Sequence, residues 1–588
     1  MRLFCSVVGF LMTGLMAQGW AAAVGMPDGG SDIRGSVPLN ASASGEVGKV
    51  ESVEPGKGKR ITIIQASPSK PFSAQFSAPV GGAIEKGERV FAVIKARLVG
   101  AEDVGEVLAK LQLSDPPYAS FGDNIGVGIH REWMELPVTF VATESIPEGK
   151  AAVVLLCGHR NQSIEVESVR LLKYPASMDL AGFPKAKPVK RTYEGREADA
   201  PWRKAALERI EQHRKADLAL TLTGEGGKPM ANAEVKLRLR RHEFGFGSAI
   251  VADRMGSDAP DDKRYRKVID DLFSIVVFEN DLKDGNWSPE FDDARRTKRN
   301  EGLNEAFDWL AERNIGVRGH YLMQVPTPYN LIDVKDNAVI RERTMASVTE
   351  RLEFVKDRVV EWDVINHPIA WVGADMLNVR PGLEQLDRDV FKLSRSKTKL
   401  PFFVNEDQVF RPGPQCDDTY AYIKSLNEAG FKVDGLGNQA HFHESYLPSP
   451  EHLLAITDKF AEIVSKQSIT EYDVVINDDE ELAADFTRDV LIAIFSHPAY
   501  TSFLWWGFWE GTHWKPEAAS WAKDWTIRER GKVMEEWIGK RWRTEVTLTT
   551  DDEGKVNWRG FPGWYDVEVG GEMKTVNITK ADPSAVLD

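Results

Sequence analysis

The chain is poor in cysteine, and this shortage excludes two kinds of architecture. Of its 588 residues only three are cysteines, Cys5, Cys157 and Cys416. Cys5 lies in an apolar N-terminal stretch, and the other two are far apart in the sequence. We therefore expect neither a disulfide framework nor a cysteine metal cluster. Cys157 ends an apolar run and is predicted to be a small core residue.

The chain has fewer positive than negative residues and lacks long apolar runs, and both features argue against certain partners. The net charge is −15, and nucleic acids and anionic membrane surfaces are themselves negative, so we expect neither as a partner. After residue 23 no stretch approaches the ~18 uninterrupted apolar residues of a membrane-spanning helix. His443 and Glu444 stand near His441, but their loose spacing predicts no metal site, and no cofactor motif is found.

The first 23 residues have the pattern of an export signal. Arg2 supplies a positive charge, residues 3–16 are apolar, and Ala21, Ala22 and Ala23 are small residues suited to cleavage. We predict that residues 1–23 are a signal peptide and that the protein is secreted or periplasmic.

Composition then predicts the domain boundaries. Residues 24–58, rich in Gly, Ser, Pro and Ala, indicate a flexible linker. Residues 59–175 contain short alternating runs between turn residues, which is typical of a β-sandwich. Residues 176–215 predict a second linker and a helix. Residues 216–243 read as a β hairpin, because two β-prone runs flank a Gly- and Pro-containing turn.

A rhythm of strand then helix fills residues 244–542. The expected strands are residues 244–250, 275–279, 316–322, 359–366, 402–405, 435–441, 469–474 and 503–506. Eight such units over ~300 residues predict a closed, parallel barrel. Residues 543–588 are again short β-prone runs, and with the hairpin they predict a small β layer at the closed end of the barrel. The predicted fold class is therefore α/β: a (β/α)8 TIM barrel with an N-terminal β-sandwich domain and a small C-terminal β layer.

Polar and aromatic residues gather where the expected strands end, the place where a barrel of this kind carries its active site. These endings are Glu279 and Asn280, His320, Asn366, Asn405 and Glu406, Gln439 and His441, Glu471, and Trp506. A sugar site needs such groups: amides and imidazoles for hydroxyls, indoles for the C–H faces of the ring, and a carboxylate for the anomeric carbon. Glu471, within the β-prone run 468–475, is interpreted as the nucleophile.

The barrel resembles glycoside hydrolase family 10, the retaining endo-β-1,4-xylanases. The matching stretches are residues 278–283 (FENDLK), 318–320 (RGH), 362–366 (WDVIN), 435–441 (GLGNQAH), 469–471 (ITE) and 506–507 (WG). The resemblance implies cleavage of internal β-1,4 bonds of xylan or a related β-glycan with retention. It implies that Glu471 is the nucleophile and that Asn366 holds the sugar 2-hydroxyl. It further implies sugar binding by Glu279, Asn280, Lys283, His320, Trp506 and Trp514, and orientation of the nucleophile by Gln439 and His441.

Two positions depart from the family pattern. The family has a glutamate acid/base directly after the strand-four asparagine, where this chain has His367, and a Trp-His pair where this chain has Gln324-Val325. An imidazole, with an ordinary pKa near ~6.5, can donate a proton and then accept one. Asp375 and Glu406 are candidates for a substitute acid.

Two hypotheses therefore stay open. The first is a hydrolase in which His367 serves as the acid/base. The second is a xylan- or polysaccharide-binding protein without effective turnover, built on the same barrel. The β-sandwich resembles jelly-roll carbohydrate-binding modules in architecture alone, and its Trp133 and Tyr118 are candidates either for stacking on a sugar or for core packing.

Overall fold

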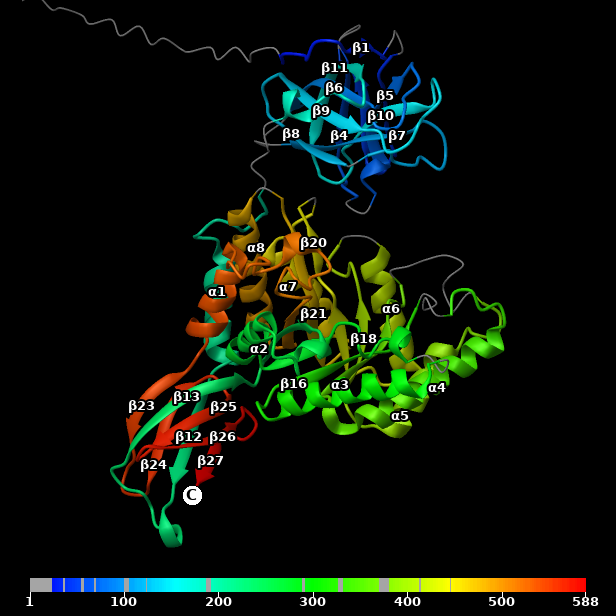
Figure 1. Cartoon of the computed structure of the whole chain (residues 1–588). Coiled ribbons are helices and arrows are strands. Elements are labelled where there is room, and N and C mark those ends of the chain that lie inside the picture. Colours follow the sequence, from blue (N-terminus) through cyan, green and yellow to red (C-terminus); the bar gives the residue numbers. More distant parts are fainter. Residues whose placement is uncertain are drawn as a thin grey trace, which may run out of the picture. The chain divides into compact units, whose positions relative to one another are not determined.

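The computed structural model describes residues 24–34, 38–53, 58–67, 70–99, 105–122, 124–186, 192–287, 291–325, 331–369, 380–411, 414–444, 446–477 and 479–588. The chain divides into two compact units, one up to Lys190 and one from Arg191 onward (Figure 1). The predicted signal peptide, residues 1–23, lies outside the described residues. Among the helices that are described, none has the length and apolar character to cross a membrane.

The first unit is a sandwich of two antiparallel sheets. One has the strand order β3-β4-β11-β6-β9, with β1 beside β11, and the other has the order β2-β5-β10-β7-β8. Ile61 and Ile94 from the first sheet and Phe76 and Val153 from the second are buried in one shared core. The strands are β1 Ser31–Asp32, β2 Asn40–Ala43, β3 Gly48–Ser52, β4 Lys59–Ile63, β5 Ala74–Val80, β6 Arg89–Val99, β7 Gly105–Leu113, β8 Ile125–Ile129, β9 Met134–Val141, β10 Ala151–Leu156 and β11 Ser163–Tyr174.

The prediction of a flexible linker over residues 24–58 is wrong, because β1, β2 and β3 lie in this segment and pair with both sheets. β2 and β3 are edge strands with few apolar residues, so their composition resembles that of a linker. Part of the predicted second linker is also held in place. Tyr193 donates a hydrogen bond of 2.8 Å to Asp489, and Arg196 donates one of 2.9 Å to Asp485, both on α8 (Glu480–Ser496).

Strands from both ends of the second unit form a smaller β-sandwich. Its sheets have the orders β24-β12-β27 and β23-β13-β25-β26. The strands are β12 Ala216–Leu222, β13 Glu234–His242, β23 Glu545–Thr549, β24 Lys555–Gly560, β25 Gly563–Val569, β26 Glu572–Ile578 and β27 Ser584–Leu587. The hairpin predicted over residues 216–243 is wrong, because β12 and β13 lie in different sheets. The Gly- and Pro-containing segment between β12 and β13 takes the chain from one sheet to the other. β13 ends three residues before the first barrel strand, so this sandwich adjoins the N-terminal ends of the barrel strands.

The predicted (β/α)8 barrel is confirmed. Its parallel strands run in the order β19-β18-β17-β16-β15-β14-β22-β21, and pairing of β19 with β21 closes the ring. The short strand β20 (His441–His443) adds to β21. The barrel strands are β14 Gly245–Ile250, β15 Ile275–Phe278, β16 Gly316–Gln324, β17 Glu361–Asn366, β18 Phe402–Glu406, β19 Gly435–Asn438, β21 Lys466–Val475 and β22 Tyr500–Trp505. These strands are buried almost throughout, as expected for a parallel sheet covered on both sides.

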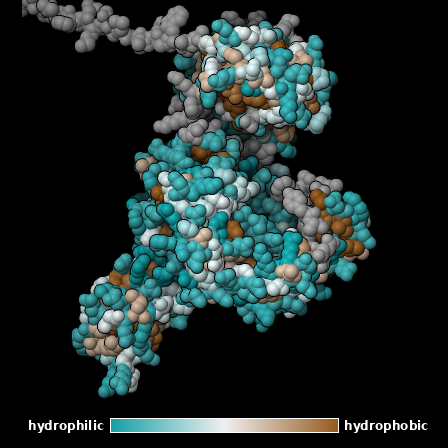
Figure 2. Space-filling model, in the orientation of Figure 1, coloured by the Kyte–Doolittle hydropathy of each residue, from teal (hydrophilic) through white to brown (hydrophobic). Residues whose placement is uncertain are grey.

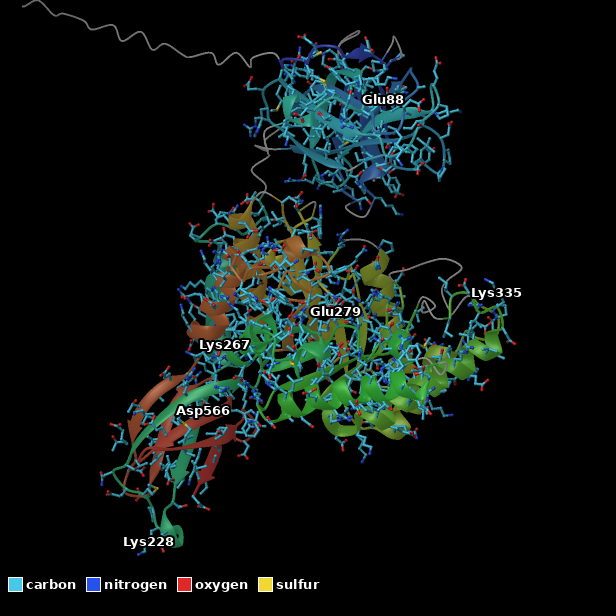
Figure 3. All side chains as sticks on the ribbon, in the orientation of Figure 1. Glu88, Lys228, Lys267, Glu279, Lys335 and Asp566 are labelled. Carbon is cyan, nitrogen blue, oxygen red and sulfur yellow. The ribbon has the colours of Figure 1, made fainter. Side chains whose placement is uncertain are left out.

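Helices surround the barrel. They are α1 Pro201–His213, α2 Pro260–Leu272, α3 Asp293–Ala311, α4 Asn337–Val355, α5 Leu386–Lys397, α6 Pro414–Glu428, α7 Pro450–Ala461, α8 and α9 Glu529–Glu536. The outer surface visible in Figure 2 is predominantly hydrophilic. Figure 3 shows Glu279 inside the barrel unit, whereas Lys267 and Lys335 lie at its periphery.

Glycine is required where β14 meets β15. A Cβ on Gly247 would lie 1.9 Å from the Ile275 carbonyl oxygen, which is backbone in a neighbouring strand and has little freedom to move. We expect Gly247→Ala to lower the free energy of unfolding of the barrel unit by about 2 kcal/mol or more, as overpacked cores do. Urea unfolding followed by tryptophan fluorescence measures this loss. The matched control is Gly285→Ala, whose Cβ has no atom within 4 Å; an equal loss in both variants would contradict the explanation.

Candidate active site

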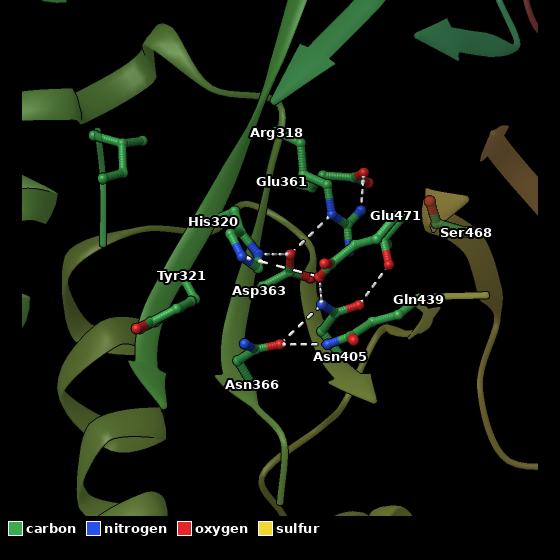
Figure 4. A network of polar contacts seen from close by, with 12 residues as sticks. Arg318, His320, Tyr321, Glu361, Asp363, Asn366, Asn405, Gln439, Ser468 and Glu471 are labelled. Atoms are coloured by element: carbon green, nitrogen blue, oxygen red, sulfur yellow. Dashed lines mark hydrogen bonds and ion pairs between the residues drawn. The ribbon is translucent and has the colours of Figure 1, made fainter. Parts of the chain in front are cut away.

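Glu471, on β21, is the centre of a polar network at the C-terminal ends of the barrel strands. Its side chain is buried, with 5% exposure. Asn405, on β18, donates a hydrogen bond of 2.8 Å to Oε1 (Figure 4). His441 Nε2 lies 3.3 Å from Oε2. Both carboxylate oxygens therefore have a donor.

The surroundings keep Glu471 ionised. Burial alone would raise the pKa of this carboxyl. The hydrogen bond from His441 and the electrostatic effects of His320, His441 and Lys283 outweigh burial and lower the pKa of Glu471 to about 2. A buried carboxylate at neutral pH has the charge that attack on an electrophilic carbon requires.

His441 lies between two carboxylates. Its Nδ1 is 2.9 Å from Asp473 Oδ2, and its Nε2 faces Glu471. Burial would lower the pKa of this imidazole, but Asp473 and Glu471 raise it to about 10. Asp473 also accepts a hydrogen bond of 2.8 Å from Trp514 Nε1. His441 is therefore an imidazolium at neutral pH, with fixed orientation.

Three amides connect the carboxylate to the neighbouring strand ends. Asn366 Oδ1, at the end of β17, accepts hydrogen bonds from Asn405 (2.9 Å) and from Gln439 (3.2 Å). Asn366 Nδ2 in turn donates to Gln324 Oε1 at 3.1 Å. Asn405 thus contacts Asn366 and Glu471 at once, which fixes the distance between the two side chains that the sequence predicted to meet the sugar.

A buried ion pair supports the network from below. Arg318 contacts Asp363 and Glu361, and both Arg318 and Asp363 are fully buried. Asp363 Oδ2 also lies 2.9 Å from His320 Nδ1. This contact directs His320 Nε2 toward Glu471, 4.0 Å from Oε1 (Figure 4). An unpaired charge in this buried place would cost free energy, so Arg318, Asp363 and His320 hold each other in one arrangement.

His367 follows Asn366 and adopts a positive φ of 53°. Its Nδ1 lies 3.5 Å from Oε1 of Glu406, a fully buried carboxyl, and its Nε2 lies 3.2 Å from Gln439 Nε2. Gln439 donates in this orientation, which puts the imidazole proton on Nδ1, toward Glu406. His367 is therefore linked to Glu471 through Gln439, Asn366 and Asn405.

Of the two candidates for a substitute acid, Glu406 and Asp375, only Glu406 lies among the described residues. Glu406 accepts hydrogen bonds from the backbone amides of Ile369 (2.7 Å) and Asp407 (2.8 Å) and is fully buried, so it faces His367 rather than open space. Asp375 lies outside the described residues.

Glu279, Lys283 and Trp506 form another side of the site. Lys283 Nζ lies 5.3 Å from the centre of the Trp506 ring, and the His320 ring lies 5.2 Å from it. Burial, reinforced by the charge of Glu471, raises the pKa of Glu279 against the opposing effect of Lys283. Asn280 is exposed beside Glu279. Trp514 is 51% exposed and lies 5.0 Å from the His441 ring, which leaves indole surface open to a ligand.

Asn405, Asp473 and Asp363 hold Glu471, His441 and His320 respectively, and no such role was predicted for any of the three. Period-two alternation was a signal for Asp473, since residues 471 and 473 share a face of the same strand. Asn405 was visible as a strand ending, but its position between two other side chains depends on the register of three strands.

The pKa of His441 predicts a pH dependence of stability. A group with a raised pKa in the folded state stabilises it fully below the unfolded value near ~6.5 and loses this effect as the pH rises through the folded value, here about 10. We expect the stability difference between wild type and His441→Gln to fall between pH 6.5 and 10, by up to about 1.4 kcal/mol per pH unit. Urea unfolding at several pH values measures it.

The control for this measurement is His497→Gln. Burial lowers the pKa of His497, so its contribution changes only below the unfolded value and should stay constant between pH 7 and 10. A constant difference for His441→Gln across the same range would contradict the assignment of an imidazolium.

The chain is similar to known proteins over the barrel. Residues 237–529 match glycosyl hydrolase family 10. Anti-sigma-I factor RsgI6 of Acetivibrio thermocellus is 30% identical over 377 residues, which are 63% of this chain and 46% of that protein. Endo-1,4-beta-xylanase 2 of Arabidopsis thaliana is 26% identical over 370 residues, 60% of this chain and 32% of that protein. The chain thus spans less than half the length of either relative.

Among solved structures, native xylanase 10B from Thermotoga maritima aligns with a TM-score of 0.44 and 19% identity, over 51% of this chain and 97% of that one. The closed parallel barrel, the polar strand endings and the match over residues 237–529 lead to one assignment. The barrel of this chain belongs to glycosyl hydrolase family 10.

Proposed function

We propose that the protein hydrolyses internal β-1,4-xylosidic bonds of xylan or a related β-glycan with retention of configuration. The observation that carries this proposal is the buried, ionised Glu471, with a donor on each oxygen. The xylanase relatives support xylan as the substrate class. The reaction would take place at the C-terminal ends of β17, β18 and β21.

In the first step, Glu471 attacks the anomeric carbon and the glycosidic bond breaks, which gives a covalent glycosyl-enzyme. Asn405 and His441 are aligned to hold Glu471 for this attack. Asn366, fixed by Asn405 and Gln439, is in place to hold a sugar hydroxyl close to the nucleophile. Glu279, Asn280, Lys283, His320, Trp506 and Trp514 line the remaining rim for sugar hydroxyls and ring faces.

His367 is the proposed acid/base. With the Gln439 amide turned away from Nε2, the imidazolium gives its Nε2 proton to the leaving oxygen; as the neutral base it then takes a proton from the water that hydrolyses the intermediate. Glu406, at Nδ1, stabilises the positive charge that the imidazole carries before the first transfer. His367, paired with Glu406, would thus supply the two protonation states that the acid/base glutamate supplies elsewhere in the family.

A second candidate function is binding of polysaccharide without turnover. Two observations favour it: the residue after Asn366 is an imidazole instead of a carboxyl, and a relative that shares 30% identity is named an anti-sigma factor rather than an enzyme. In this function the same rim holds the sugar chain, and Glu471 is a hydrogen-bond acceptor for hydroxyls.

Two substrates separate these functions, because an activated aryl β-xylobioside needs little acid help and xylan needs full acid help. We expect wild type to cleave both and Glu471→Gln to cleave neither. His367→Ala should lower turnover of xylan by about 10²–10⁴, the usual worth of acid–base catalysis, while formation of the glycosyl-enzyme from the aryl substrate stays within about tenfold. His443→Ala, an exposed imidazole near the site, is the matched control and should act like wild type.

The stalled intermediate of His367→Ala gives a second readout. Without a base, water is a poor nucleophile toward the glycosyl-enzyme, whereas the azide anion needs no base. Added azide should therefore restore turnover of the aryl substrate and give a β-glycosyl azide, detectable by NMR. Equal activity of His367→Ala and wild type on xylan would remove His367 from the mechanism. If wild type cleaves neither substrate but binds xylohexaose in calorimetry, and Trp506→Ala weakens that binding, the protein has the second function.

A further inference from the structure

The N-terminal sandwich carries a cavity on the outer face of the sheet β3-β4-β11-β6-β9. Its volume is about 590 Å³, and it is lined by Glu51, Ser52, Val53, Arg60, Arg97, Trp133 and Glu167. The alternation along the strands explains the location: Ile61, Ile164 and Leu98 point into the core, so their neighbours Arg60, Glu165 and Arg97 point outward. The volume is within the ~300–1,000 Å³ usual for small-ligand sites.

The floor of this cavity is held in one arrangement. Glu165 pairs with Arg60 on β4 and with Arg97 on β6 in the strand register, and it forms ion pairs with both side chains. Although it points outward, Glu165 is fully buried beneath the two guanidinium groups. Among the described residues, Arg97 has an acceptor for its Nε–H alone, so its terminal amino groups remain able to donate to a ligand.

Trp133 forms the aromatic part of the cavity. It is half-buried, lies just before β9 and belongs to none of the hydrophobic core clusters of the described residues. The Arg97 guanidinium lies 4.8 Å from the centre of its ring, which fixes the orientation of the indole. Of the two roles that the sequence left open for Trp133, this position favours contact with a ligand over core packing. Tyr118, 51% exposed, is not part of the cavity lining.

The charges around the cavity cancel. Arg60, Arg97 and the neighbouring Lys95 face Glu51, Glu165 and Glu167, and Lys95 is paired with Glu167 at 2.6 Å. An anionic ligand would gain from the guanidinium groups but meet two carboxylates in the walls. A neutral sugar satisfies both kinds of group, because its hydroxyls donate to carboxylates and accept from guanidinium, while its C–H face stacks on the indole.

We propose that this cavity is a second carbohydrate site, which takes part of a neutral polysaccharide chain with Trp133 as its stacking platform. The choice of xylan as the first ligand to test rests on the function proposed for the barrel; the site itself does not. Such a site would attach the protein to insoluble polysaccharide independently of what the barrel cleaves.

The test is depletion of the full-length chain onto insoluble xylan, cellulose and mannan. The parent carries Glu471→Gln and Trp506→Ala, so that turnover is absent and binding by the barrel is weakened. We expect this parent to bind at least one of the three polymers, and Trp133→Ala to weaken that binding by about tenfold, the upper range for an aromatic contact. Trp133→Phe should restore most of it. Tyr118→Ala, which removes an exposed aromatic ring from the same unit, is the matched control and should bind like the parent.

Three outcomes would overturn the proposal: no binding of the parent to any of the polymers, equal binding of the parent and Trp133→Ala, or an equal loss in Tyr118→Ala. Displacement by soluble polygalacturonate but not by soluble xylan would overturn the neutral ligand. A parallel assay keeps the two proposals apart. In the otherwise wild-type chain, Trp133→Ala should leave hydrolysis of the aryl β-xylobioside unchanged. The activity of Glu471→Gln therefore tests only the function proposed for the barrel, and the polymer binding of Trp133→Ala tests only the site on the sandwich.

Discussion

Keeping one carboxylate ionised and out of water is the constraint on which the barrel's polar interior depends. Burial opposes the charge on Glu471, and four groups from other strands and loops compensate for it: the Asn405 amide, the His441 imidazolium and, at longer range, His320 and Lys283. The two histidines have carboxylate partners of their own. His441 has Asp473, and His320 has Asp363, which is in turn balanced by Arg318. One buried charge is thus accompanied by alternating charges that extend as far as Arg318 on β16.

His367 lies at the edge of this network, where it contacts Gln439 and the backbone of Asn405. Its backbone amide donates to the Asn405 carbonyl at 2.9 Å, so the same residue that holds Glu471 also fixes the start of the loop after β17. The Glu406 carboxyl behind the imidazole means that the position is not simply a glutamate exchanged for a neutral ring. A carboxyl therefore lies beside the ring, supplied by Glu406 at the end of β18.

The sequence was sufficient to predict the barrel because parallel strands buried on both sides carry runs that hardly depend on tertiary context. It also pointed to Glu471, His441 and Asn366, which lie within or at the end of predicted strands and which the structure brings into one network. It was not sufficient for the partners, because the contact of Asn405 with both Asn366 and Glu471 depends on how three strands are staggered. Composition failed for β1 to β3, where edge strands carry few apolar residues, and the turn between β12 and β13 gave no sign that the chain changes sheets there.

The small sandwich of β12, β13 and β23 to β27 has a consequence for how the protein is made. Its first two strands are synthesised before the barrel and its other five after it, so on the ribosome β12 and β13 have no partners until nearly the whole barrel has emerged. Pairings this distant in sequence are slow to form, and two unpaired strands with apolar faces are exposed to association with other chains during that delay. Completion of the sandwich then brings the two ends of the barrel together, so the strands that follow the barrel in the sequence complete this unit.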